Sequence, residues 1–491
     1  MNRAIYGLPW ILALGACTLA ACTLGPNFTP PSVHTAPGYA APGEAPPPAD
    51  QHISIGPAGA QTEADWWTQF HSRKLDDVMA LANAGNQNIK AATARVAQAR
   101  EEVNAAEGAL LPQLSLDATA GRQKYGVALF GPANINVPAF TYYSVGPSLT
   151  MPLDLFGANR RKVEETKAYK AYQGYQLDAA MLSLTGSVAA EALAIASARA
   201  QIAVLQNIVA DDRHNIALVQ TSLDAGTATR TQLLSAQSQM ASDQTLLPEL
   251  QQQESAARHA LAILVGKAPA DWVVPDFNLT DFTLPAQITA GLPSELLHRR
   301  PDIRAAEAEL HMASAAIGVA TANLYPQIDL TGTLLQEALM PGNLFNASAA
   351  AWSIAANLTQ PLYDGGQLSA KRRATLDGYQ ASLASYRQTI LISFGQVADQ
   401  LQALSHDADQ LRDQNAAAQI SLDARDLARR SYSAGNSGIL DVIDAERRAA
   451  QAQLGLSRAT AQRLLDTARL YVALGGTPVP VPKPAAKGQI D

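Results

Sequence analysis

The chain has 491 residues and a formal net charge of −7, with 36 basic and 43 acidic side chains. This mildly acidic balance argues against a nucleic-acid-binding protein, because such proteins usually present a basic stripe. The only two cysteines are Cys17 and Cys22, so a mature chain beginning at the second has neither a disulfide nor a cysteine metal site.

Residues 1–21 have the layout of a secretory signal peptide, in which Arg3 precedes an apolar run. The run ends at Cys22 in the sequence LAAC, which resembles a bacterial lipobox, and LGAC at Cys17 is a poorer second candidate. We therefore expect removal of residues 1–21, a lipid on Cys22, and a lipidated, proline-rich segment over residues 22–64. No run of 18 unbroken apolar residues follows, so entry into a membrane by a helix is not expected.

Two long tracts without proline, 153–247 and 362–477, predict long uninterrupted helices. The tracts are copies, because Gly226 and Gly435 lie 209 positions apart, as do Pro152 and Pro361. The sequence therefore predicts an internal duplication: a first structural repeat over 65–285, a second over 286–478, and a C-terminal tail over 479–491.

Between the helical tracts the periodicity changes to two, which predicts β-hairpins near 113–152 and near 327–361. Leu116 and Leu330 fall on the apolar side of their strands, whereas Thr119 and Thr331 fall on the polar side. A half-buried soluble sheet gives the same alternation, but a lipidated leader favours strands of a transmembrane barrel. Four strands cannot close a barrel, and an open edge is not tolerated in lipid, so several chains must share one barrel.

Each repeat continues from its hairpin into a long helix and a return helix. The expected bounds are 157–223 and 229–265 in the first copy, and 366–432 and 439–474 in the second. A helix of this length extends roughly 100 Å. Apolar residues recur every seven positions from Met181 to Leu223, which predicts left-handed coiling against neighbouring helices. A soluble coiled-coil scaffold would explain the heptads equally well, but it would not explain the strands.

Several segments resemble one family, the outer membrane efflux proteins of the TolC type, and in particular the lipidated branch related to OprM and NodT. They are CTLGPNFTPP after the leader, RRPDIRAAEAEL at 299–310, AAIGVATANLYPQIDLTG at 315–332, and YSAGNSGILDVIDAERRAA at 432–450. The resemblance implies a mixed α and β fold and a homotrimer. Three chains would give a twelve-stranded outer-membrane β-barrel continuous with a long periplasmic α-helical barrel. The implied partners are a periplasmic adaptor, an inner-membrane pump of the RND type and outer membrane lipid.

The resemblance also implies a periplasmic gate at the far end of the helices. Asp441 and Asp444, three positions apart on one helix face, match the acidic constriction of the family, and Tyr432 matches a tyrosine that ties the closed tip together. A solvated acidic helix start is the alternative interpretation of the two acids. The glycine turns at Gly226 and Gly435 are expected to face the adaptor.

No catalytic constellation is found in the sequence. The eight histidines are scattered, without HExxH spacing, and neither a GxSxG elbow nor a phosphate-binding glycine loop occurs. We therefore expect no enzyme, no cofactor and no metal site. Three functions fit the sequence: the outer membrane exit duct of a tripartite efflux pump, the exit duct of a type I protein secretion system, or a lipid-anchored periplasmic scaffold without a pore. The lipidated N-terminus favours the efflux duct by analogy with the family.

Overall fold

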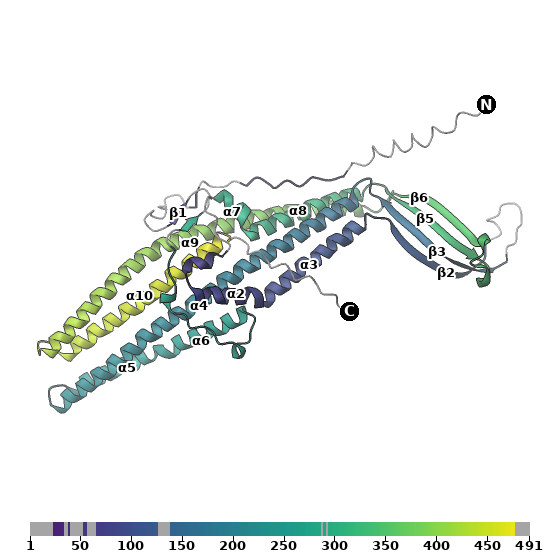
Figure 1. Cartoon of the computed structure of the whole chain (residues 1–491). Coiled ribbons are helices and arrows are strands. Elements are labelled where there is room, and N and C mark those ends of the chain that lie inside the picture. Colours follow the sequence, from purple (N-terminus) through teal and green to yellow (C-terminus); the bar gives the residue numbers. More distant parts are fainter. Residues whose placement is uncertain are drawn as a thin grey trace. The chain divides into compact units, whose positions relative to one another are not determined.

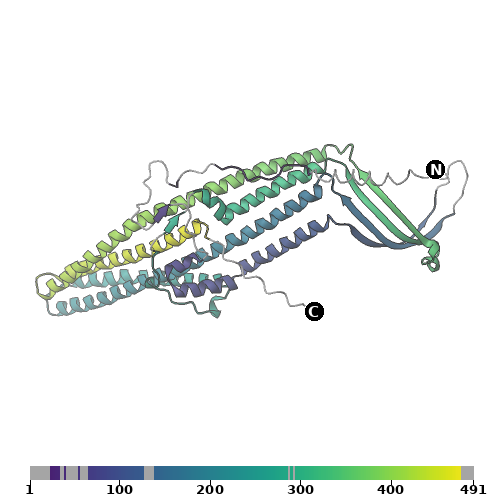
Figure 2. The ribbon, with the colours of Figure 1, turned by 45° about the horizontal axis from the view of Figure 1, so that its top comes forward.

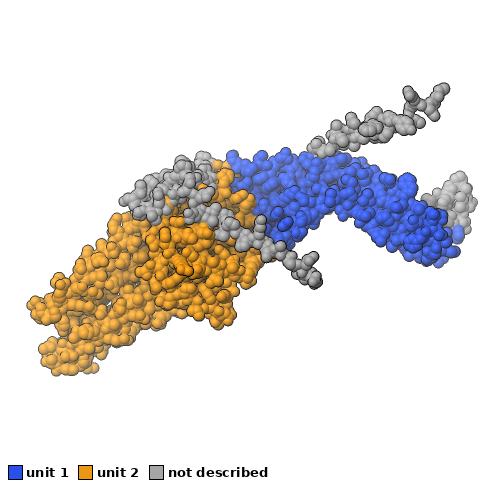
Figure 3. Space-filling model, in the orientation of Figure 1, with its two compact units in different colours: residues 1–32, 95–173, 305–386 blue, residues 33–94, 174–304, 387–491 orange. Residues whose placement is uncertain are grey.

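The computed structural model describes residues 23–33, 38–39, 53–55, 65–125, 138–285, 288–290 and 293–476. Cys17, Cys22 and the expected tail at 479–491 lie outside the described residues. The chain divides into two compact units (Figure 3). Unit 1 comprises residues 1–32, 95–173 and 305–386, and unit 2 comprises residues 33–94, 174–304 and 387–491.

The elements follow the order expected for a duplicated chain (Figure 1). Those up to residue 285 are β1 (Ile53–Ile55), η2 (Trp66–Phe70), α2 (Arg73–Gly85), α3 (Gln87–Gly108), β2 (Gln113–Gln123), β3 (Phe140–Leu153), α4 (Ala158–Asp224), α5 (Arg230–Gln244) and α6 (Leu246–Leu264). The later ones are β4 (Ile288–Ala290), α7 (Pro293–Arg299), α8 (Pro301–Ala322), β5 (Gln327–Ala338), β6 (Ala350–Thr359), α9 (Gln367–Ser433) and α10 (Ile439–Ala473).

The internal duplication is confirmed by the lengths and positions of these elements. Helices α4 and α9 each have 67 residues and begin 209 positions apart. Helices α3 and α8 each have 22 residues and begin 214 positions apart. The register agrees as well, because Gln113 pairs with Thr150 in the first hairpin and the equivalent Gln327 pairs with Thr359 in the second.

The expected single return helix at 229–265 is wrong, because the structure has two helices, α5 and α6, separated at Thr245. Pro248 explains the break. A proline has no N–H to donate to the carbonyl four residues earlier and its ring clashes with that carbonyl, so it is tolerated only in the first turn of a new helix. The second copy has no proline at this place, and α10 continues without interruption.

Unit 1 contains a four-stranded antiparallel sheet with the strand order β2-β3-β5-β6. The ladder between β3 and β5 is interrupted between the pairs Val145–Gln336 and Ser148–Thr333. Pro147 lies in this interval, and its missing N–H removes one ladder donor. The strands run 11, 14, 12 and 10 residues, close to the length that crosses a bilayer at a tilt.

Unit 2 contains two helix hairpins. Helices α5 and α6 lie alongside α4, and α10 lies alongside α9 (Figures 1 and 2). Within the described residues, α4 contains an 18-residue window that is apolar enough to cross a membrane, and 50% of this window is buried inside the chain.

Arg300 fixes the start of α8 in unit 2, and Pro301 occupies the first helical position, where a proline is tolerated. The Arg300 guanidinium is buried and donates hydrogen bonds to the carbonyl oxygen of Ala473 at 2.8 Å, to Gln396 at 2.7 Å and to Asp302 at 2.7 and 3.0 Å. Because the carbonyls at a helix C-terminus lack intrahelical partners, this arginine caps α10.

Candidate functional site

The sheet has one exposed apolar face. Cross-strand pairs place Leu114 beside Leu149, Leu330 beside Ala356, and Leu334 beside Trp352, so these side chains share a face. In the single chain Leu116 is 74% exposed, Trp352 74% and Ile354 80%. Such a broad exposed apolar surface marks contact with lipid or with another protein.

The opposite face is lined by hydroxyls, an amide and carboxylates. Ser115 and Ser148 are hydrogen-bonded at 2.6 Å, Ser148 also donates to Asp117, and Thr333 and Ser353 are hydrogen-bonded at 2.7 Å. Thr331 accepts a hydrogen bond from Asn357 at 3.3 Å. The positions of Leu116, Leu330 and Thr331 agree with the expected apolar and polar sides, and an alternation of this kind suits lipid outside and water inside.

The sheet has two free edges, one on β2 and one on β6. In lipid every backbone N–H and C=O group needs a partner, and none of the described residues of the chain covers these edges. Pairing β2 of one chain with β6 of the next satisfies both edges at once, and repetition around an axis closes a barrel.

The tip turns have the same conformation in both copies. Gly226 and Gly435 have φ of +77° and +75°, which favours glycine because other residues clash there. Gly226 donates to Leu223 and Thr227 to Ser222, at 2.9 and 2.8 Å. The equivalent bonds in the second copy, from Gly435 to Tyr432 and from Asn436 to Ser431, are both 2.9 Å. Each long helix therefore ends in a glycine cap that reverses the chain.

The three residues suggested as a gate lie in the second tip. Tyr432 of α9 is half-buried against an apolar cluster formed by Val219 of α4, Leu233 of α5, and Ile439 and Val442 of α10, so these residues together join the four helices of the tips. The carboxylate of Asp441 accepts a hydrogen bond from the N–H of Gly438 at 3.0 Å, which caps α10. Asp444 pairs with Arg447 and Arg448, both at 2.7 Å. Both acids therefore already have partners within their own chain.

A partly buried polar cluster on the helices that carry the tips was not foreseen from the sequence. Asn215 of α4 donates to Glu446 of α10, and Arg429 of α9 donates to Glu446 at 2.6 Å and to Asp211 at 3.0 Å. A cavity of about 340 Å³ lies beside these residues and is also lined by Asp212 and Asp243. The only sequence signal was the presence of polar residues on the predicted helices.

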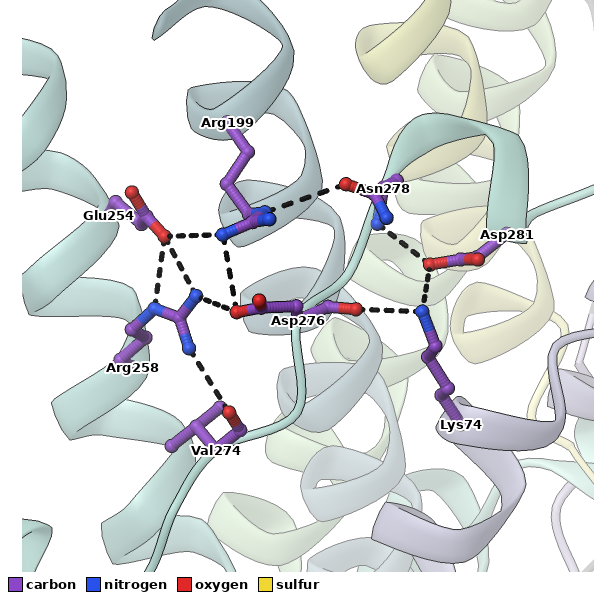
Figure 4. Close-up of polar contacts among 8 residues, drawn as sticks. All are labelled: Lys74, Arg199, Glu254, Arg258, Val274, Asp276, Asn278 and Asp281. Carbon is purple, nitrogen blue, oxygen red and sulfur yellow. Dashed lines mark hydrogen bonds and ion pairs between the residues drawn. The ribbon is translucent and has the colours of Figure 1, made fainter. Parts of the chain in front are cut away.

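A second unforeseen network anchors the segment that follows α6 (Figure 4). Arg258 pairs with Asp276 and with Glu254, the latter at 2.8 Å, and Arg199 of α4 reaches Asp276 at 3.2 Å. Lys74 of α2 donates to the carbonyl of Asp276 and to the carboxylate of Asp281, both at 2.8 Å. The hydrogen bond from Arg258 lowers the pKa of the Asp276 carboxyl, so this carboxylate stays ionised at neutral pH.

The described residues directly after Cys22 belong to unit 1 and are held against its helices. Arg161 donates to the carbonyls of Leu24 and Gly25, at 3.0 and 3.2 Å, and to Asn27 at 2.8 Å. The ring of Phe28 stacks on His311, with centroids 4.4 Å apart. A Cβ at Gly25 would lie 2.4 Å from the Cα of Gly318, so only glycine fits at this contact.

The chain is similar to known proteins over most of its length. The family model of the outer membrane efflux protein matches residues 78–267 and 292–476, one match in each repeat. The pyoverdine export outer membrane protein OpmQ of Pseudomonas aeruginosa is 31% identical over 87% of this chain and 90% of its own length. Nodulation protein T of Rhizobium leguminosarum bv. viciae is 28% identical over 85% of each chain. Among solved structures, the outer-membrane channel OprN matches with a TM-score of 0.81 and 27% identity, over 93% of this chain and 99% of its own.

The fold and the two-faced sheet define an outer membrane channel, and the chain belongs to the outer membrane efflux protein family. Members of this family are trimeric channels that extend from the outer membrane into the periplasm. They act as the exit ducts of tripartite efflux pumps, with a periplasmic adaptor and an inner-membrane RND pump, and this chain is such an exit duct. The relatives compared are channel proteins and not enzymes.

Proposed function

We propose that this duct exports small organic molecules and that it opens and closes at its helix tips. The sheet carries the proposal, because its exposed apolar face and its hydroxyl-lined face suit a water-filled passage through lipid. The similarity to OpmQ, named for pyoverdine export, supports a small-molecule cargo. No catalysis is needed, because a duct wall touches its cargo only in passing.

Deleting the gene tests the cargo class. We expect the deletion strain to become sensitive to small toxic compounds, and the intact gene to restore resistance while the amount of secreted protein stays unchanged. Loss of a secreted protein without a change in compound sensitivity would instead indicate the exit duct of a protein secretion system.

The gate is proposed at Tyr432, Asp441 and Asp444, with the turns at Gly226 and Gly435 facing the adaptor. Because Asp441 caps α10 and Asp444 pairs with two arginines, closure should depend mainly on Tyr432 and the apolar cluster beneath it. The acids contribute a negative field, which a threefold arrangement would concentrate near the axis.

Single-channel recording tests the gate. Tyr432→Ala removes the ring from the cluster and should raise the resting conductance, and Tyr432→Phe separates the contribution of the hydroxyl from that of the ring. Asp441→Asn combined with Asp444→Asn should weaken cation selectivity and block by divalent cations. Unchanged selectivity and block in the double variant would remove both acids from the conducting path.

Cys22 is the proposed site of lipid attachment. The docking of residues 24–28 onto unit 1 supports this proposal, because it fixes the chain only two positions beyond the cysteine. Mass spectrometry of the mature N-terminus should find an acylated Cys22, and an acylated Cys17 would overturn the assignment. Because a closed barrel holds itself in lipid, refolded Cys22→Ser trimers should still conduct.

A further inference from the structure

Each helix hairpin of unit 2 contains a pair of neighbouring carboxyl groups. In the first hairpin Asp212 of α4 and Asp243 of α5 line the same cavity, and in the second Asp466 of α10 is the neighbour of Asp407 of α9. Asp212 is 9% exposed and Asp407 is 7% exposed. Asp212 lies 14 positions before Gly226 and Asp243 lies 17 after it, so the pair ties the two arms of one hairpin together.

The two pairs share a local design. The acid on the return helix is held by a glutamine four positions earlier: Gln239 donates to Asp243 at 2.9 Å, and Gln462 donates to Asp466 at 2.7 Å. The acid on the long helix has one buried oxygen that no donor among the described residues satisfies, Oδ2 in both Asp212 and Asp407.

The pairs are not copies of each other made by the duplication. The positions equivalent to Asp212 and Asp243 in the second repeat are Ser421 and Ala452. The same arrangement therefore occurs twice in unrelated places, which an accidental contact between two surface acids does not explain.

Two carboxyl groups that lie this close favour one shared proton. Two ionised carboxylates have only acceptor atoms and repel each other, so a hydrogen bond between them needs a proton on one. A neutral carboxyl is also easier to bury than a charged one, which suits the unsatisfied oxygen. The described residues hold no cluster of three or more His, Cys, Asp or Glu side chains suited to a metal ion.

The groups around Asp212 favour its protonation. Asp243 faces it from α5, Glu446 from α10 and Asp211 from α4, and together with burial, the largest cause, they raise the pKa of Asp212 to about 7. Arg429 of α9 is already paired with Asp211 and Glu446, and Arg425 of α9 and Arg447 of α10 line the same cavity.

Burial and the neighbouring Asp466 both favour the protonated form of Asp407. They raise its pKa to about 6, against the opposing charges of Arg463 of α10 and His406 of α9. Arg469 pairs with Asp466 at 2.9 Å, through the oxygen that does not accept from Gln462.

We propose that each carboxyl pair is a binding site for one proton, which holds the return helix to the long helix, and that loss of the proton loosens the hairpins that carry the tips. When the pH rises, both members ionise and repel each other, and the arms separate more easily. The duct should then open more readily at pH 8 than at pH 5.5. This last step depends on the proposed gate at the tips, whereas proton binding does not.

Amide hydrogen exchange tests proton binding directly. After correction for intrinsic rates, wild-type α5 and α10 should exchange about tenfold faster at pH 8 than at pH 5.5, the factor expected for one pKa unit of differential stability. Asp212→Asn combined with Asp407→Asn should remove this ratio, because an asparagine amide donates to the partner carboxylate at every pH. The matched control is Asp224→Asn with Asp409→Asn, which changes exposed acids on the same two helices.

A wild-type exchange ratio near one, or a double Asn variant that keeps the wild-type ratio, would overturn the proposal. The wild-type ratio alone can overturn the proposal, so the test is still decisive if the double Asn variant fails to fold. If EDTA abolishes the low-pH protection, the pair binds a metal ion and the assignment to a proton is wrong. If exchange responds as expected but conductance does not change with pH, the gate at the tips is overturned while the proton sites stand.

Discussion

At the scale of single residues, Asp212 links the stability of the folded chain to pH. Its folded pKa of about 7 lies above the ordinary value of 3.8, so the folded state holds a proton that the unfolded state has lost. The resulting stabilisation is complete below about pH 4 and is lost as the pH rises towards 7. The slope is at most about 1.4 kcal/mol per pH unit for one proton.

Thermal unfolding in detergent measures this effect. The quantity compared is the midpoint temperature of the wild type minus that of Asp212→Asn. This quantity should be smallest at pH 8 and should increase steadily as the pH falls to 5. A difference that stays constant over this range would mean that Asp212 does not titrate between pH 5 and pH 8.

Contacts between individual side chains that are distant in the sequence are hard to predict from the sequence. The glycines at 226 and 435 stand out because a repeat and a turn both require them. The contact between Asp212 and Asp243 depends on the rotational phase of two helices about their axes, and polar residues in a heptad pattern predict only a solvated face. Arg300 could be assigned to a helix start, but its hydrogen bond to Ala473, 173 positions away, depends on how the helices pack.

At the scale of elements, the two faces of the strands make opposite predictions for the same substitution. Leu116→Arg or Leu330→Arg places a charge on the apolar face and should destabilise the barrel by about 2 to 4 kcal/mol near the bilayer midplane. Thr119→Arg or Thr331→Arg lies on the polar face, so the protein should assemble and change only its conductance.

The four variants are compared by the fraction of heat-resistant trimer on gels and by single-channel current. The threonine variants are the matched controls, because they introduce the same side chain into the same strands. Equal assembly of all four variants would show that these strands do not sit in a membrane.

The elements themselves were largely predictable because their signals are periodic. Proline-free tracts and the repeat offsets placed both long helices within one residue of their observed ends, and strict alternation located all four strands. The repeat predicts one continuous return helix, because the second copy has no proline at this place, whereas Pro248 alone marks the break between α5 and α6. The parallel pair of β1 and β4 was not predicted, since strands of three residues leave no periodic signal.

At the scale of the whole molecule, one chain is incomplete as a channel. Its sheet has two free edges, and its apolar face is exposed in the single chain. The need for several chains therefore follows from the sequence and elementary physics, because four strands cannot enclose a lumen. The number three does not follow from these arguments, and it comes from the family to which the chain belongs.

Conductance of the purified assembly tests the central claim most directly. Full-length protein, extracted from outer membranes and separated as a heat-resistant trimer, is added to a planar lipid bilayer. The account predicts stepwise currents of uniform size that appear with the trimer fraction and are absent from the heat-dissociated monomer. A well-folded trimer that inserts into the bilayer and carries no current, even when Tyr432→Ala should hold the tips open, would contradict it.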